Sequence, residues 1–208
     1  MARDAKATQE RLLKAAATEF STHGISGARV DRIAAAAGSN KAQIYHYFDS
    51  KDGLFDEVMR TMIVDRTRDI PIDTTDLPGY GARLFDSYED HPEVVRLATW
   101  HRLEHSRADH LFEPVVASLK EKVAAIAEAQ DRGELSRRFE ATTLLGLVLH
   151  LASIWTVTTP EFFAVLGASS RKMRRQVVVD SIRTILGEDP DPKLVAPAAG
   201  GGRDAEDR

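Results

Sequence analysis

The feature that most constrains the fold is a series of apolar residues at helical spacing, interrupted by glycine, proline and charged breaks. Within residues 5–23, Leu13, Ala17 and Phe20 fall on one face of a helix, and Gly24 follows as a stop. No stretch shows the sustained alternation or the β-branched runs that are typical of a strand. The sequence therefore predicts an all-α protein.

The same pattern predicts a succession of helices. Two short ones, over residues 29–37 and 40–47, are separated by Gly38, and Asp49 or Ser50 offers a cap for a longer helix over residues 51–68. Five further helices are expected at 80–90, 92–106, 112–131, 140–157 and 170–186, each bounded by proline or glycine.

Changes in composition divide the chain into parts. A connector rich in proline, aspartate and threonine begins at residue 69. We therefore expect a head over residues 1–51, joined by the helix 51–68 to a body over residues 69–187. The tail, residues 188–208, is rich in proline and glycine and too poor in apolar residues to build a core, so the sequence predicts that it is disordered.

Composition excludes several classes of site. The chain has no cysteine, so it has no disulfide framework and no thiolate metal site. No apolar run approaches the roughly 20 residues of a membrane span, and the polar N-terminus lacks the apolar stretch of a secretory signal. We expect a cytoplasmic protein with no membrane partner, no cofactor, no metal ligands and no catalytic residues.

Charge is distributed unevenly. The net charge is −4, but residues 1–51 carry eight Lys and Arg against five Asp and Glu, and the remainder carries 20 against 27. The first part is therefore at +3 and the rest at −7. Lysine and arginine supply most of the sequence-independent affinity for DNA by neutralising phosphates. This asymmetry favours a head that meets phosphate and a body that does not.

The third predicted helix has the composition of a DNA-reading element. Helical spacing turns Ile44 and Phe48 inward and leaves the polar and aromatic residues between them on outer or flanking faces. Gln43 suits the adenine edge, Lys41 suits guanine or phosphate, and Ala42 is small enough to approach a thymine methyl group. Three helices with a glycine turn before the third match the helix-turn-helix plan.

This region resembles the N-terminal domain of the tetracycline-repressor (TetR) family. The residues that carry the resemblance are Ile33-Ala34, Ala37-Gly38, the run from Tyr45 to Lys51 (YHYFDSK), and Leu54. The resemblance implies a homodimeric regulator with a helix-turn-helix head and a helical-bundle body, which binds a small-molecule effector and dimerises through its last two long helices. It implies base contacts by Lys41, Ala42 and Gln43, and contacts to phosphates or nearby groups by Tyr45, Tyr47, Lys51, Asn40 and His46.

Two positions depart from the family pattern. Ser39 stands in the turn where an apolar residue is usual, and Arg29 stands where a threonine commonly opens the second helix. Arginine cannot act as an N-cap through an acceptor oxygen, so we expect Arg29 to reach a phosphate and Ser26 to supply the cap.

The body offers candidates for an effector pocket and a dimer interface. Ligand pockets are chiefly apolar and aromatic with a few polar groups, and core packing competes with that role for each candidate. The candidates for the pocket are Phe85, Tyr88, Trp100, His101, Phe112, His150 and Trp155. The nearly all-apolar helices suggest subunit contact or core packing for Leu147, Leu151, Val177, Val178, Ser181 and Ile185.

The leading hypothesis is a ligand-controlled repressor that binds a palindromic DNA operator as a homodimer. Two alternatives remain at this point. His101, Glu104 and His105 fit an H-x-x-E-H pattern of zinc peptidases, although no third ligand is identifiable. The other alternative is a structural helical dimer that does not bind DNA.

Overall fold

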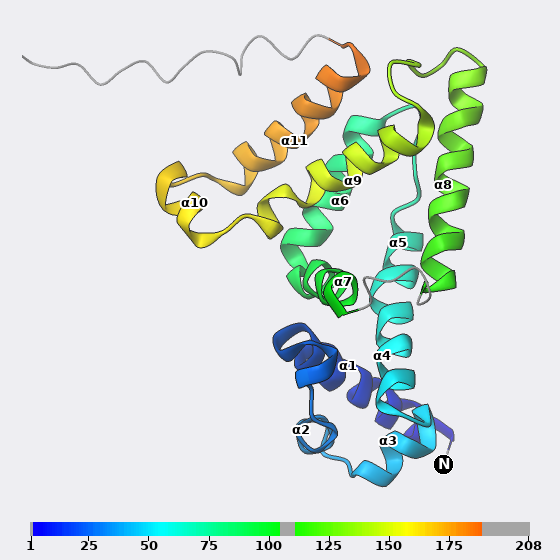
Figure 1. The fold of residues 1–208 in the computed structure, drawn as a ribbon, viewed down its shortest axis with the longest axis vertical. Coiled ribbons are helices and arrows are strands. Elements are labelled where there is room, and N and C mark those ends of the chain that lie inside the picture. Colours follow the sequence, from blue (N-terminus) through cyan, green and yellow to red (C-terminus); the bar gives the residue numbers. More distant parts are fainter. Residues whose placement is uncertain (1, 105–110, 189–208) are drawn as a thin grey trace, which may run out of the picture.

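The computed structural model describes residues 2–104 and 111–188, and in these residues every regular element is helical (Figure 1). The prediction of an all-α protein is confirmed. Within the described part of the chain, no single helix is both long and apolar enough to cross a membrane, and one pair of helices meets that test only when joined across a bend of 86°. The predicted tail falls outside the described residues from residue 189 onward.

Four helices form the head around one apolar core. Their inward faces carry the apolar residues that helical spacing selects, with Phe20, Ile33, Ile44 and Leu54 almost fully buried. The helices are α1 (Ala2–Gly27), α2 (Val30–Ala36), α3 (Lys41–Phe48) and α4 (Lys51–Met59). The predicted stop in the first helix is a kink, because Gly24 adopts φ +71° and one more helical turn follows it.

Side-chain caps fix where α3 and α4 begin. The Asn40 side chain accepts a hydrogen bond from the Gln43 amide at 3.0 Å and begins α3. The Ser50 hydroxyl accepts one from the Gly53 amide at 2.9 Å and begins α4. Each cap satisfies a backbone donor that would otherwise lack a partner. The start of α3 is therefore set by local chemistry.

The connection from head to body follows the predicted helix 51–68 but is not a uniform α-helix. After α4 the chain forms a π-helix, η1 (Arg60–Asp65), and then a short α5 (Arg66–Asp69). Figure 1 shows α4 and α5 along one line between the two parts. The π-helix interrupts regular α-helical geometry in the segment that connects head and body. Such interruptions often occur at functional sites.

The body packs around a second core. Leu84, Val148 and Ile182 are fully buried there, and α6 lies against both α9 and α11 (Figure 1). Its helices are α6 (Leu77–Asp90), α7 (Pro92–Glu104), α8 (Glu113–Asp131), α9 (Ala141–Val157), α10 (Pro160–Leu166) and α11 (Arg171–Leu186). Sequence reasoning missed α10, although Thr159 as N-cap and Pro160 at the first helical position are its usual signals.

One body helix also belongs to the head core. Leu97 of α7 is fully buried in the apolar cluster of the head, and Phe112 packs against the same cluster. The helix α7 lies directly against α1. Head and body are therefore joined at two places, through α4 to α5 in the chain and through α7 in space.

Candidate DNA interface and the body cleft

The outer face of α3 lies at the end of the molecule farthest from the body (Figure 1). Ile44 and Phe48 are buried beneath it, as the helical phase predicted. The residues that the sequence assigned to the duplex lie on the other side, where Lys41, Ala42, Tyr45 and His46 are exposed and Gln43 and Tyr47 are half-buried. The geometry leaves this face open to a duplex.

The Gln43 side chain is oriented by a residue that the sequence did not single out for this purpose. The Ser39 hydroxyl hydrogen-bonds the Gln43 side-chain oxygen, and Ser39 is the departure from the family pattern in the turn. This bond leaves the amide –NH₂ of Gln43 as the group available to a partner. An amide held in one orientation loses less freedom on binding than a rotating one.

Lys41 is paired with an acidic residue of α2. Its Nζ lies 2.5 Å from Oδ1 of Asp31, and Arg29 Nη2 lies 3.7 Å from Oδ2 of the same carboxylate. The hydrogen bond from Lys41 holds the pKa of Asp31 below its ordinary value. All three side chains are about half exposed or more. A carboxylate is thus embedded among the basic residues of the candidate interface.

Two of the predicted phosphate contacts also have structural partners within the head. Tyr47 packs against the head core and lies edge-on to His46, with ring centroids 5.2 Å apart. Lys51 Nζ lies 3.4 Å from the carbonyl oxygens of Ser26 and Ala28. Lys51 therefore links the start of α4 to the turn between α1 and α2.

The expected Ser26 cap of the second helix is wrong. Arg29 occupies the N-cap position with no side-chain cap, and its backbone amide donates to Oε1 of Glu19 at 2.9 Å. Glu19 also accepts from Arg32 Nε at 2.7 Å. The Ser26 hydroxyl instead donates to Glu104 of α7 at 2.6 Å. Glu19 of α1 therefore satisfies the backbone amide of the N-cap residue, and Ser26 serves the contact between head and body.

That contact is a set of hydrogen bonds from α7 to the kink in α1. The carboxylate of Glu104 accepts from the amides of Ile25 and Ser26, each at 2.8 Å, and Trp100 Nε1 donates to the Ser21 carbonyl at 3.2 Å. A Cβ at Gly24 would lie 2.5 Å from Glu104 Oε1 and 2.8 Å from a ring carbon of Trp100. Only glycine permits this approach.

The predicted pocket aromatics are dispersed. His101 stacks on Phe55 of the head with ring centroids 6.2 Å apart, and Trp155 donates to the Arg174 carbonyl and packs beside Phe163. Phe85 is buried in the body core, Phe112 packs on the head core, and Trp100 lies at the junction described above. Tyr88 and His150 line one hollow together, of about 210 Å³.

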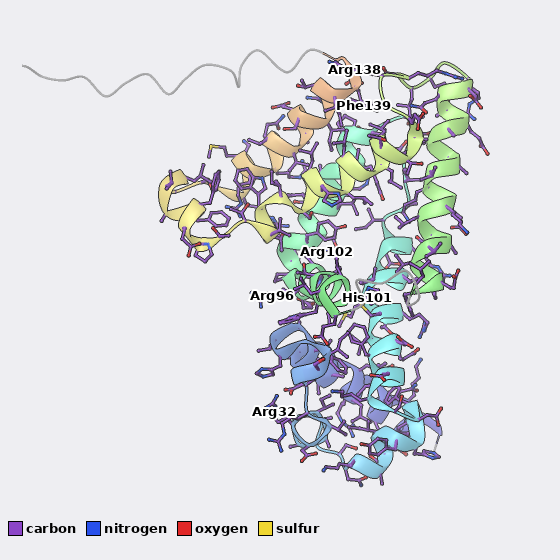
Figure 2. The ribbon with its side chains drawn as sticks, viewed as in Figure 1. Arg32, Arg96, His101, Arg102, Arg138 and Phe139 are labelled. Carbon is purple, nitrogen blue, oxygen red and sulfur yellow. The ribbon has the colours of Figure 1, made fainter. Side chains whose placement is uncertain are left out.

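A larger cleft lies between α7 and α9, with a volume of about 750 Å³. We call it the α7–α9 cleft. Its walls are mainly apolar, and among the described residues that line it Arg102 is the one with a formal charge. Figure 2 places Arg102 and His101 on α7, between the head and α9. The lining residues are Val95, Ala98, Thr99, Arg102, Leu147, His150, Leu151, Ser153, Ile154 and Val157.

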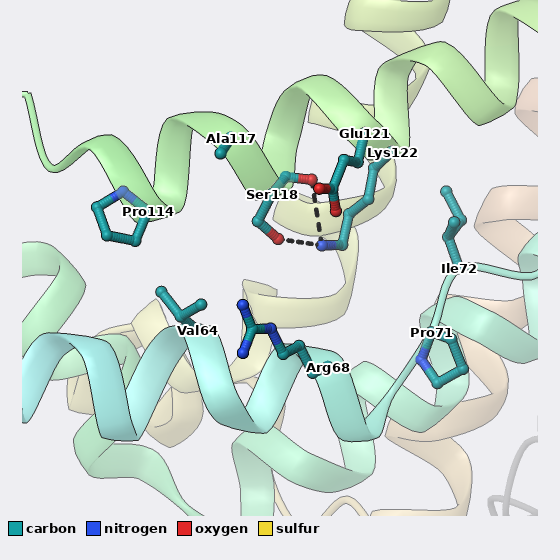
Figure 3. A pocket seen from close by; sticks show the side chains of 9 residues that line it. All are labelled: Val64, Arg68, Pro71, Ile72, Pro114, Ala117, Ser118, Glu121 and Lys122. Carbon is teal, nitrogen blue, oxygen red and sulfur yellow. Dashed lines mark hydrogen bonds between the residues drawn. The ribbon is translucent and has the colours of Figure 1, made fainter.

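A second hollow, of about 370 Å³, separates η1 and α5 from α8 (Figure 3). Arg68 enters it from one side and Lys122 from the other. Lys122 Nζ donates to the Ser118 hydroxyl at 2.5 Å, and burial lowers the pKa of Lys122. Sequence reasoning named none of these residues, because the hollow depends on how α8 packs beside the connecting helix.

The predicted dimer residues also differ in exposure. Val178 is 1% exposed and buried in the core of its own chain, so it offers no surface to a second subunit. Val177 is 44% exposed, whereas Ser181 and Ile185 are half-buried, and Leu147 and Leu151 line the α7–α9 cleft. Further apolar residues of this part of the body are exposed, although the sequence did not predict them for the interface: Ile154, Val157, Phe162, Val165 and Met173.

The H-x-x-E-H pattern does not form a metal site in the part of the chain that the structure describes. No group of three potential ligands was found there. Both oxygens of Glu104 accept hydrogen bonds from the head, and His101 stacks on Phe55. His105 lies outside the described residues. The hydrolase alternative has no support.

Two family models match the chain. The model "Bacterial regulatory proteins, tetR family" matches residues 12–58, and "Tetracyclin repressor-like, C-terminal domain" matches residues 76–183. The first covers α2, α3 and nearly all of α4, and the second covers most of the body.

Individual relatives agree with these models. The chain is 39% identical over 169 residues to the HTH-type transcriptional repressor SCO4008 of Streptomyces coelicolor, covering 79% of this chain and 86% of that protein. It is 25% identical over 200 residues to the HTH-type transcriptional regulator RutR of Escherichia coli K12, covering 92% and 94%. Among solved structures, the putative transcriptional regulator SCO4942 from Streptomyces coelicolor superposes with a TM-score of 0.77 at 34% identity, over 86% of this chain and 97% of that one.

Proposed function

The chain belongs to the TetR family of DNA-binding transcription regulators, and on that premise we propose that it is an effector-responsive repressor that binds a palindromic operator as a homodimer. The observation that carries the proposal is the exposed outer face of α3. The opposite side of this helix packs into the head core through Ile44 and Phe48, and Asn40 caps its start. Relatives named as repressors support repression as the outcome.

The proposed contacts divide by chemistry. Lys41, Ala42 and Gln43 meet base edges in the major groove, because they lie on the first turn of the recognition helix. Donors at the rim of the same surface meet phosphates, which position the head without reading sequence. The proposed rim residues are Arg29, Asn40, Tyr45, His46, Tyr47 and Lys51.

Dimerisation is proposed through the side of the body formed by α9, α10 and α11. Exposed Val157, Phe162, Val165 and Val177 give this side apolar surface, and a contiguous exposed apolar surface is typical of a protein interface. A two-fold dimer presents two recognition helices to related half-sites, so the operator is expected to be palindromic.

The α7–α9 cleft is the proposed effector site. Its volume and apolar lining are those of a small-molecule pocket. The same helix that carries Val95, Thr99 and Arg102 into the cleft carries Trp100 and Glu104 to the head. An effector that prefers one position of α7 would shift the head between two arrangements, with a coupling of typically 1–3 kcal/mol. We therefore propose that residues 1–51 read DNA and residues 69–187 sense the effector.

Fluorescence anisotropy with the promoter fragment of the adjacent gene, at stated salt, tests the proposed function. Gln43→Ala should lower the discrimination between this fragment and a mixed-sequence duplex by about 1–3 kcal/mol, because it removes a base contact. Lys51→Ala should weaken binding to both duplexes alike. Lys120→Ala, on an exposed part of α8, is the matched control and should change neither.

Failure of the wild-type protein to bind either duplex would contradict the proposal and favour a purely structural dimer. Unchanged discrimination in Gln43→Ala would remove α3 from base reading even if DNA binding persists.

A further inference from the structure

Asp31 places a carboxylate in the candidate DNA interface that the proposed function does not require. Asp31 lies near the start of α2 and pairs with Lys41 across the gap to α3, with 2.5 Å between Nζ and Oδ1. It also lies 3.7 Å from a guanidinium nitrogen of Arg29. Both cations belong to the set proposed to meet DNA, so Asp31 stands within the same surface.

The pair lowers the positive charge that a duplex meets. Phosphate neutralisation supplies nearly all of the affinity for DNA of arbitrary sequence. A lysine whose ammonium already donates to a carboxylate gains less from a phosphate than a lysine that donates only to water. A carboxylate near the backbone is also repelled by it, since like charges at short range cost energy.

A base edge, in contrast, can accommodate the carboxylate. An ionised carboxylate only accepts hydrogen bonds, and an amino group such as cytosine N4 in the major groove is a suitable donor. A duplex that presents an amino group at this position compensates Asp31, and a duplex that presents only acceptors does not. The penalty therefore depends on sequence.

We infer that Asp31 is a specificity-determining residue of the DNA-reading head, which suppresses binding to arbitrary DNA by holding Lys41 and by demanding an amino donor from the duplex. The inference rests on the proposed function. Asp31 thus acts in the opposite sense to the basic residues around it, because it lowers affinity in general and raises the ratio of specific to non-specific binding.

The test is the salt dependence of binding to a short mixed-sequence duplex and to the promoter fragment. Asp31→Asn should bind the mixed duplex about two- to fivefold tighter at low salt, as expected for release of one exposed ion pair. The slope of log K against log salt should steepen by about 0.9, the value for one added phosphate contact, because on a duplex of arbitrary sequence the released Lys41 meets a phosphate instead of a base edge. The promoter affinity should rise less, so the specificity ratio falls.

Two further variants separate this role from a change in net charge. Asp131→Asn makes the same charge change and breaks an ion pair of the same 2.5 Å length, to Arg137, at the far end of α8. It should leave the slope and the ratio unchanged. Adding Lys41→Gln to Asp31→Asn should return the slope to the wild-type value.

Wild-type binding with no change of slope or ratio in Asp31→Asn would overturn the inference alone. Equal changes in Asp131→Asn would also overturn it, since net charge would then explain them. Absence of DNA binding by the wild-type protein would overturn the proposed function together with the inference.

Discussion

The proposed DNA-reading face of α3 and the α7–α9 cleft are built in opposite ways. The α3 face takes its residues from one capped helix of eight residues, Lys41–Phe48. The cleft takes its residues from α7 and α9, with α8 lying between them in the chain. A site on one helix is fixed by local spacing, whereas a site between two helices depends on the packing of the whole body. The first is therefore readable from a short motif and the second is not.

The largest expected effect tests whether the head is independent of the body. Leu97→Ala, on a body helix, should destabilise the head by about 2–5 kcal/mol, because its side chain is fully buried in the head core. Amide hydrogen exchange along α1 measures this. Leu145→Ala, in the body core, is the control and should leave the protection of α1 almost unchanged. Equal loss of protection in both variants would mean that head and body unfold as one unit.

The junction itself gives the next largest effect. Glu104→Gln should cost about 1–2 kcal/mol, since hydrogen bonds to a charged acceptor are stronger than those to an amide and this side chain is partly exposed. The amides of Ile25 and Ser26 should then exchange about tenfold faster. Glu134→Gln, which removes an exposed pair with Arg132, is the control. Unchanged exchange at these amides would show that Glu104 does not hold the head.

Removing one N-cap from the head and one from the body tests how each part affects DNA binding. Asn40→Ala should destabilise α3 by about 1 kcal/mol and weaken DNA binding, because it removes the acceptor for the Gln43 amide. Thr159→Ala removes the cap of α10 in the same way and should leave DNA binding unchanged. Anisotropy titrations measure the DNA affinity of both variants. An equal loss of affinity in the two would contradict the expectation that the cap of α3 has a specific effect on DNA binding.

The smallest expected effect depends on pH. Burial alone would raise the pKa of Glu19, but hydrogen bonds from Arg32 and from the Arg29 amide outweigh it and the pKa lies below the ordinary 4.5. A lowered carboxyl pKa contributes stability at neutral pH that is lost as the pH falls below 4.5 and through the pKa of the folded state. The contribution is about 1 kcal/mol.

Thermal melts of the head helices over this pH range measure the contribution of Glu19. The wild-type protein should lose more stability than Glu19→Gln as the pH falls. Parallel curves would assign the acid sensitivity to other groups.

The sequence predicted the residues of the α3 face better than it predicted contacts between distant segments of the chain. Ile44 and Phe48 set the phase of α3, so the outward residues followed from spacing and motif. The pairing of Lys41 with Asp31 and of Gln43 with Ser39 required the placement of α2 and the turn. The hydrogen bond that the Ile25 amide donates to Glu104 spans 79 residues of sequence and has no local signal. The predicted pocket aromatics lie apart in the structure, because an aromatic residue suits a core as well as a pocket and its sequence position does not tell the two apart.

The most direct test of the central claim is photo-cross-linking from the outer face of α3. A photoreactive phenylalanine analogue in place of the exposed Ala42 should cross-link to the bound promoter duplex, because the proposed function places this position against the major groove. The same analogue at the exposed Ala124 of α8 should not cross-link. Cross-linking from position 124 but not from position 42, in protein that still binds the duplex, would contradict the account.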